Sequence, residues 1–355
     1  MTTRRHIAVS LMGILVGSVF AAPARALDVV YRRSTSRPTQ GTITDDSRTS
    51  ISVKARLRKT PEVVPVNDIV RVRFDGEPAS LNLNRIDEAG GRLKRALDGY
   101  VKAFSDSSLT NERLKTDLEF LIARVTAKIA LVDPALRKQA VAKLEAFRKT
   151  HSGSFRYYET LSWLAKVYMA QRNFTAVPAV FASLEKAPWH DYQMAARIGK
   201  ARLLLLQNQL NEAQAAFQAV IGEPAKGPFE LARRYEAQIG KATCLQRQKR
   251  YADAVKELEN VIQHAPAEAS ALQAEAYLRQ GDNLEALGKT KEAVMAYLHV
   301  DLLFSQEKPL HAEALYHLVR LWAAVGKPGR AADARARLTG TYPNSPWSRK
   351  LQAGG

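Results

Sequence analysis

Residues 195–205 read AARIGKARLLL and residues 236–246 read EAQIGKATCLQ, so the tetrapeptide IGKA occurs twice at an offset of 41 residues. The match continues at the same offset through apolar and small positions, namely Leu204 with Leu245, Ala213 with Ala254, and Val220 with Val261. Self-similarity at a fixed offset indicates a repeat array in which each unit is one supersecondary element. The spacing of the apolar residues is that of helices, so the sequence predicts stacked helical pairs.

A marker residue recurs through the rest of the chain near the start of the second helix of each predicted pair, and it is alanine except at Val177: Ala96, Ala140, Val177, Ala213, Ala254, Ala293 and Ala331. Ala201, Ala242 and Gly281 stand twelve residues before three of these markers. This spacing resembles the tetratricopeptide repeat family, in which small residues lie where the two helices approach most closely. The resemblance implies a mainly α protein, a right-handed superhelix of helical hairpins with a groove along its first helices. The markers are 36 to 44 residues apart, whereas the family period is about 34, so the repeats are divergent.

The first 26 residues have the features of a secretory signal peptide. Arg4 and Arg5 form a basic start, residues 7–22 are apolar, and Ala24 and Ala26 supply the small residues of a cleavage site. The apolar run of 16 residues is shorter than the roughly 20 that a membrane span requires. We therefore expect export to the periplasm or cell envelope, with cleavage near Ala26.

Residues 28–75 alternate between apolar and polar residues instead of following a helical period, most clearly in 51–57 and 70–74. Period two predicts strands with one buried face. Turn signals divide the segment into five strands, at 28–33, 40–45, 49–58, 62–66 and 69–74. Strands this short are expected to close into a small β-barrel, similar in spacing to SH3-like and Sm-like modules. Such a module either binds a ligand or caps the first helices.

These patterns divide the chain into four parts. They are a signal peptide (1–26), a small β-barrel module (27–78), degenerate helical repeats (79–151) and a repeat array (152–348). The single cysteine, Cys244, excludes an intramolecular disulfide and is expected in the core.

The chain of 355 residues carries a formal charge of +18, and the excess is spread along the whole sequence. A nucleic-acid-binding protein usually concentrates its cations in one patch with a reading element, so nucleic acid is not expected as a partner. In an exported protein, the charge favours either contact with an anionic envelope component or solubility alone.

The sequence lacks the spacings HExxH, GxSxG, CxxC and GxGxxG, so it predicts no enzyme, no catalytic residue, no cofactor and no metal site. An enzyme with residues dispersed in sequence remains as a third interpretation, because catalytic partners meet in space.

The family resemblance implies that a set of first-helix side chains faces the groove: Glu159, Lys166, Arg202, Gln246, Asp282, Glu285, Tyr316 and Arg320. Lys166 and Arg202 are candidates for holding a carboxylate, and Asp282 and Glu285 add the opposite charge. Mixed charge suits an extended peptide, so the main hypothesis is a non-enzymatic scaffold of the cell envelope that binds partner proteins or peptides. The alternative is a binder of anionic polymer or membrane that uses the β module and the basic face.

Overall fold

The computed structural model describes residues 27–266 and 269–353. The predicted signal peptide lies outside these residues. Within the described ranges, no helix has the length and apolar character needed to cross a membrane.

All five predicted strands are present, as an antiparallel sheet in the order β4–β3–β2–β1–β5. The strands are β1 (Asp28–Arg32), β2 (Thr39–Asp46), β3 (Ser50–Lys54), β4 (Glu62–Pro65) and β5 (Ile69–Arg73). The third strand ends at Lys54, four residues before its predicted end. The prediction of a closed barrel is wrong, because β4 and β5 are the two unpaired edges of an open sheet.

The sheet stays open because helices cover the face that a barrel would turn inward. Val30, Ile51 and Val72 of the strands belong to the same buried cluster as Leu118 and Phe120 of the third helix. Burial of this apolar face is the main stabilising contribution, and the helices supply it without closure of the sheet. The structure therefore favours the interpretation of the β module as a cap on the first helices.

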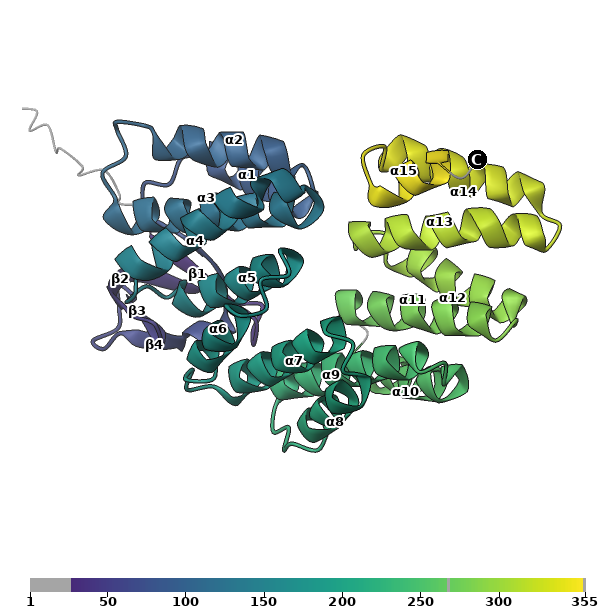
Figure 1. The fold of residues 1–355 in the computed structure, drawn as a ribbon. Helices are drawn as coiled ribbons and strands as arrows, with labels where there is room; N and C mark the ends of the chain where they lie inside the picture. The colour runs from purple at the N-terminus through teal and green to yellow at the C-terminus, as the bar shows by residue number, and fades with distance from the viewer. Residues whose placement is uncertain (1–26, 267–268, 354–355) are drawn as a thin grey trace, which may run out of the picture.

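Among the described residues after the sheet, the α-helices form seven hairpins and a final single helix (Figure 1). The hairpins are α1 (Ser80–Ala89) with α2 (Leu93–Phe104), α3 (Glu112–Val132) with α4 (Arg137–Thr150), α5 (Tyr157–Ala170) with α6 (Val177–Leu184), α7 (His190–Leu206) with α8 (Leu210–Ile221), α9 (Pro228–Arg247) with α10 (Tyr251–His264), α11 (Ser270–Ala286) with α12 (Thr290–Leu303), and α13 (Lys308–Ala324) with α14 (Pro328–Thr341). Helix α15 (Pro346–Ala353) ends the described chain.

The predicted markers of the second helices are confirmed. All seven lie in the even-numbered helices from α2 to α14, and all are buried, namely Ala96, Ala140, Val177, Ala213, Ala254, Ala293 and Ala331. Cys244 of α9 is also buried, and burial raises the pKa of its thiol to about 11, which agrees with its predicted place in the core.

The IGKA motif is explained by a close approach between helices. Gly199 of α7 lies against the ring of Phe181, and Gly240 of α9 lies against the ring of Phe217. A Cβ atom at either glycine would overlap the aromatic ring. The two glycines thus allow each first helix to pack directly on the second helix of the preceding hairpin.

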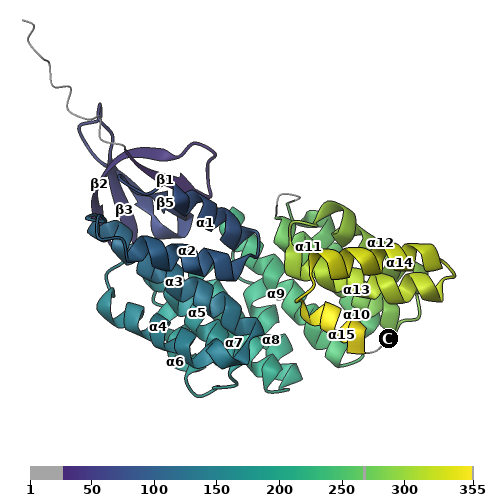
Figure 2. The same cartoon turned by 90° about the horizontal axis from the view of Figure 1, so that it is seen from above.

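The hairpins follow a curved path, so that the first and last hairpins face each other in Figure 1. The Lys308 ammonium at the start of α13 donates a hydrogen bond to the carbonyl of Gly90 at the end of α1. The strands lie at the N-terminal end of the molecule, away from α13 to α15 (Figure 2). They also reach the middle of the array, where the Asn67 amide donates to the Asp191 carboxylate at 3.1 Å.

Candidate functional site

One repeat position organises the charges of the first helices. This is the position at which the two helices of a hairpin touch, and we call it the small position. It is buried in α3, α5, α7, α9, α11 and α13, where the residues are Ala123, Ala165, Ala201, Ala242, Gly281 and Val319. Six residues before it, four of these helices carry a glutamate, namely Glu159, Glu236, Glu275 and Glu313. One residue after it, four helices carry a cation, namely Arg124, Lys166, Arg202 and Arg320.

Consecutive first helices are joined by ion pairs between these positions. Arg124 of α3 lies 3.2 Å from Glu159 of α5, and Arg202 of α7 lies 2.8 Å from Glu236 of α9. Between α11 and α13 the cation is Arg279 of α11, which lies one helical turn before the ladder position. Its two terminal nitrogens donate to the Glu313 carboxylate at 3.0 and 3.2 Å. We call this series the charge ladder and the surface that carries it the inner face.

The ladder carboxylate Glu236 is enclosed by protein but is held in its charged form by two arginines. The Glu236 side chain is 21% exposed, yet desolvation by the surrounding protein strongly opposes its charge. Arg202 and Arg233 outweigh this cost and lower the pKa of Glu236 to about 2.

The ladder has two gaps. Between α5 and α7 the cation Lys166 is present, but Ala195 replaces the glutamate. Between α9 and α11 the glutamate Glu275 is present, but Thr243 replaces the cation. Within the described residues neither Lys166 nor Glu275 has an ion-pair partner.

The gap residues have pKa values shifted toward their neutral forms. Burial lowers the pKa of Lys166, and the nearby cations Arg202 and Arg233 add to the effect. Burial also raises the pKa of Glu275 and outweighs the opposing effect of Arg202 and Arg279, while the neighbouring carboxylates Glu236 and Glu313 act in the same direction as burial. Each group is therefore more easily neutralised than in water, and a ligand of opposite charge would favour its ionised form.

Six of the eight predicted groove residues lie among the charges of the inner face, and a seventh, Gln246, stands at the repeat position of Glu285, four residues after the small position. Glu159 and Arg202 belong to closed steps of the ladder, and Lys166 occupies a gap, with its ammonium 4.4 Å from the centre of the Trp163 ring. Glu285 and Arg320 form an ion pair at 3.1 Å near the C-terminal end. The sixth residue, Asp282, pairs with Arg279 at 2.6 Å and accepts a hydrogen bond from the Tyr297 hydroxyl at 2.8 Å.

The other two predicted residues have different surroundings. Tyr316 is buried beneath the last helix, with its ring centre 5.2 Å from that of Trp347 and the Lys350 ammonium over its ring. Gln246 of α9 is half-buried and makes no side-chain hydrogen bond to another described residue.

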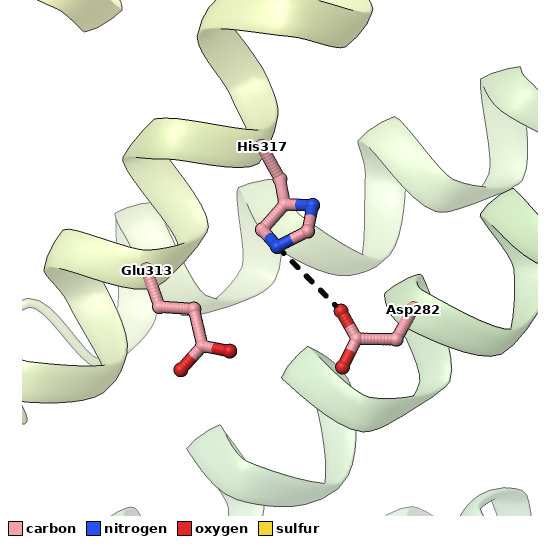
Figure 3. A group of neighbouring side chains, drawn as sticks. All are labelled: Asp282, Glu313 and His317. Atoms are coloured by element: carbon pink, nitrogen blue, oxygen red, sulfur yellow. Dashed lines mark ion pairs between the residues drawn. The ribbon is translucent and has the colours of Figure 1, made fainter. Parts of the chain in front are cut away.

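Asp282, Glu313 and His317 meet at the α11–α13 step (Figure 3). One potential ligand atom from each lies within 4.8 Å of the others, as in many metal sites. However, the Arg279 guanidinium already binds both carboxylates, at 2.6 Å to Asp282 and 3.0 Å to Glu313. A cation of the protein itself thus neutralises this cluster, and we assign no metal to it.

Seven stacked helical hairpins decide the fold, and a buried alanine, or Val177 in α6, lies where each second helix begins. The fold is TPR-like, that is, similar to stacked tetratricopeptide repeats. No family model and no curated protein matches the sequence.

Solved structures that resemble the TPR array include three proteins of low identity. They are a tetratricopeptide repeat protein from Parabacteroides merdae ATCC 43184 (15% identity, TM-score 0.47, 77% of this chain and 95% of that one), a Rap protein complexed with competence and sporulation factor (17%, 0.49, 77% and 77%), and the type IV pilus biogenesis factor PilW (16%, 0.44, 68% and 100%). At these values the likeness concerns the arrangement of helices and supports no argument about function.

The ladder itself was missed in the sequence, although a signal for it was present. Once the TPR array is aligned on its small positions, a glutamate recurs six residues earlier in four helices. The Asp282, Glu313 and His317 cluster was missed because its members come from two helices. The spacing of Glu313 and His317, four residues apart on one helix, was its visible part.

Proposed function

We propose that this protein is a non-enzymatic scaffold of the bacterial cell envelope that binds an extended segment of a partner protein on its inner face. The observation that carries the proposal is the pair of gaps in the charge ladder. The predicted signal peptide at residues 1–26 supports the location.

The steps of the ladder in which both charges are already paired are poor binding sites for a ligand. At Arg202 and Glu236 each charge already has its counterion at 2.8 Å, and a ligand would have to replace that contact with an equally good one. Breaking one partner out of an enclosed pair leaves an uncompensated charge, which is costly. Specific contacts are therefore expected at positions where the pairing is incomplete.

The two gaps meet this requirement with opposite signs. Lys166 offers a cation that is held over Trp163, and Glu275 offers a carboxylate without a counterion among the described residues. A peptide segment carrying one acidic and one basic group complements both. Such charge-assisted hydrogen bonds are stronger than neutral ones, and they fix the direction in which the segment lies.

Crosslinking from the inner face tests the proposal. A photo-crosslinking amino acid at Gln246, which makes no side-chain hydrogen bond to another described residue, is compared with one at Met295, which is 55% exposed on the second helix α12. We expect discrete protein adducts from position 246 in intact cells and about tenfold fewer from position 295. Equal labelling from both positions, or no adduct from position 246, would contradict inner-face binding.

A second candidate function is the binding of an anionic envelope component by the β module. Two loops of the module are basic, the one between β1 and β2 and the one between β3 and β4. With the strand residues that flank them, at 33–40 and 54–62, they contain six cations and one carboxylate. Attraction of this kind is screened by salt. Retention on cell-wall or vesicle preparations that falls steeply with ionic strength would support it, and the absence of retention at low salt would exclude it.

A further inference from the structure

We propose that the β3–β4 loop, residues 55–61, docks the protein on an anionic lipid bilayer. In this arrangement Leu57 enters the apolar layer while Arg56, Arg58 and Lys59 contact lipid phosphates. The proposal deepens the second candidate function, on which it rests, by naming the ligand and the residues. It is independent of inner-face binding.

Leu57 is the most exposed large apolar side chain among the described residues, at 96%. It stands in the middle of the loop and lacks the partial cover that a helix surface gives. Transfer of a leucine side chain from water to an apolar phase is favourable. A bilayer placed against this loop would bury the side chain completely.

The residues around Leu57 have the charge that an anionic bilayer attracts. Arg56, Arg58 and Lys59 are all exposed. Arg58 lies 3.4 Å from Glu62, whereas Arg56 and Lys59 have no ion-pair partner within the described ranges. An apolar tip flanked by basic residues is the arrangement in which insertion and headgroup attraction act at the same depth.

A hollow of about 350 Å³ beside the loop suits a phosphate group. It lies between the β1–β2 and β3–β4 loops, and Arg32, Arg37 and Arg58 are among its lining residues. Arg32 is engaged by Asp68 and Glu62. Arg37 has no ion-pair partner among the described residues and can turn its guanidinium group to a phosphate in bidentate geometry. Arg58 can do the same only by exchanging its 3.4 Å contact with Glu62.

The position of the loop leaves it free to meet a flat surface. Strand β3 begins after the β2–β3 turn, which contacts the helices through Arg113 and Asp46 at 2.8 Å. The strand ends at Lys54, so the loop lies at the end of β3 remote from that contact. A bilayer could approach the loop without displacing the packing of the sheet on α3.

The effect of a change at Leu57 also distinguishes binding to a bilayer from binding to an acidic polymer. A soluble polyanion would gain from the cations but would not bury the leucine. A bilayer gains from both, so the two ligands predict different outcomes for a change at Leu57 alone.

The experiment uses the chain from Leu27 onward, the predicted mature protein, with vesicles of phosphatidylcholine alone or mixed equally with phosphatidylglycerol. We expect co-sedimentation with the anionic vesicles only. Leu57→Asp should reduce binding about tenfold, as loss of a leucine transfer predicts, and Arg56→Glu combined with Lys59→Glu should reduce it at least as much.

Matched controls lie in the array. Leu302→Asp changes a leucine that is 69% exposed on α12, and Lys138→Glu combined with Lys149→Glu reverses two exposed cations of α4. Both controls should bind within about twofold of the parent. All of these positions are exposed, so each variant is expected to fold, which circular dichroism checks.

A probe of depth completes the test. Leu57→Cys labelled with an environment-sensitive fluorophore should shift to the blue with anionic vesicles, and Cys244 will not compete because it is buried. Absence of binding to anionic vesicles, or full binding by Leu57→Asp, would overturn the proposal. Retention of Leu57→Asp on purified cell wall together with loss of the double charge variant would assign the loop to an acidic polymer instead. The crosslinking at Gln246 needs no lipid, so failure of the two proposals is distinguishable.

Discussion

Two neighbouring steps of the charge ladder share helix α9 but differ in their electrostatics. In the α7–α9 step, Glu236 has Arg202 at 2.8 Å and a pKa of about 2. In the α9–α11 step, Glu275 stands at the same repeat position, but α9 carries Thr243 at the repeat position of the cation, and the pKa of Glu275 is raised. The same residue type at the same repeat position is thus a structural group in one step and an available group in the next.

The largest effect is expected from a substitution that displaces α9, the helix shared by the two steps. Gly240→Leu would place a side chain inside the ring of Phe217, which is fully buried. We expect a loss of about 3 kcal/mol in the free energy of unfolding, measured by urea denaturation. The control Gly340→Leu, in α14 where a Cβ atom meets no neighbour within 4 Å, should be neutral; equal losses would show that the packing at Gly240 is unimportant.

The next effect separates the two glutamates. Glu236→Gln removes the counterion of Arg202 and Arg233, and we expect it to lower the free energy of unfolding by about 2 kcal/mol. Glu275→Gln removes a carboxylate that has no counterion among the described residues, so it should leave stability unchanged or raise it slightly. Similar losses for both variants in urea denaturation at pH 7 would contradict the assignment of the gap.

The same two variants should differ in their pH dependence. Glu236 has a pKa of about 2, below its ordinary value of 4.5, so its stabilising contribution is full above pH 4.5 and is lost as the pH falls toward 2. The pKa of Glu275 is raised, so the contribution of its neutral form is full below its ordinary value and is lost as the pH rises. The Glu236→Gln deficit should therefore shrink in acid, whereas any Glu275→Gln gain should appear only above about pH 4.5.

A smaller effect is expected when the gap is closed. Thr243→Arg places a cation one residue after the small position of α9, as Arg202 stands in α7. Because Glu275 is only partly enclosed, the new pair should add at most about 1 kcal/mol in urea denaturation. Thr243→Gln adds length without charge and serves as the control; an equal gain from it would mean that charge pairing is not the cause.

The smallest effect concerns the turns that follow the two helices. Lys249, after α9, has a left-handed backbone with φ of 61°, and the corresponding turn after α11 has Gly288 with φ of 73°. Since a side chain is unfavourable in this region, Lys249→Gly should raise the midpoint of thermal unfolding by a few degrees. A lower midpoint would indicate that the lysine side chain contributes a contact of its own.

The sequence predicted the periodic features well because they depend on neighbours along the chain. The marker residues from Ala96 to Ala331 identify every second helix, since each hairpin packs on the next in the same way. The open sheet was not predicted, because its apolar face is covered by Leu118 and Phe120, which lie far from the strands in sequence. Non-local packing of this kind leaves no periodic signal.

The candidate site was predicted in part for the same reason. Lys166 and Arg202 were placed correctly on the first helices, but only the spatial partners distinguish them: Arg202 has Glu236, and Lys166 has Ala195 opposite. Tyr316 was expected to be available, and α15 covers it through Trp347. A residue's repeat position predicts the surface to which it belongs, while its availability depends on the adjacent helix.

The central claim is that the two gaps bind the partner. Its most direct test is the affinity of the partner captured at Gln246 for the parent protein and for the variant that combines Ala195→Glu with Thr243→Arg. This variant keeps Lys166 and Glu275 and supplies each with an internal counterion at the equivalent ladder positions. We predict affinity at least about tenfold weaker with stability equal or higher, because each lost charge-assisted contact is worth about 1.5–3 kcal/mol. Unchanged affinity in a folded variant would contradict the account.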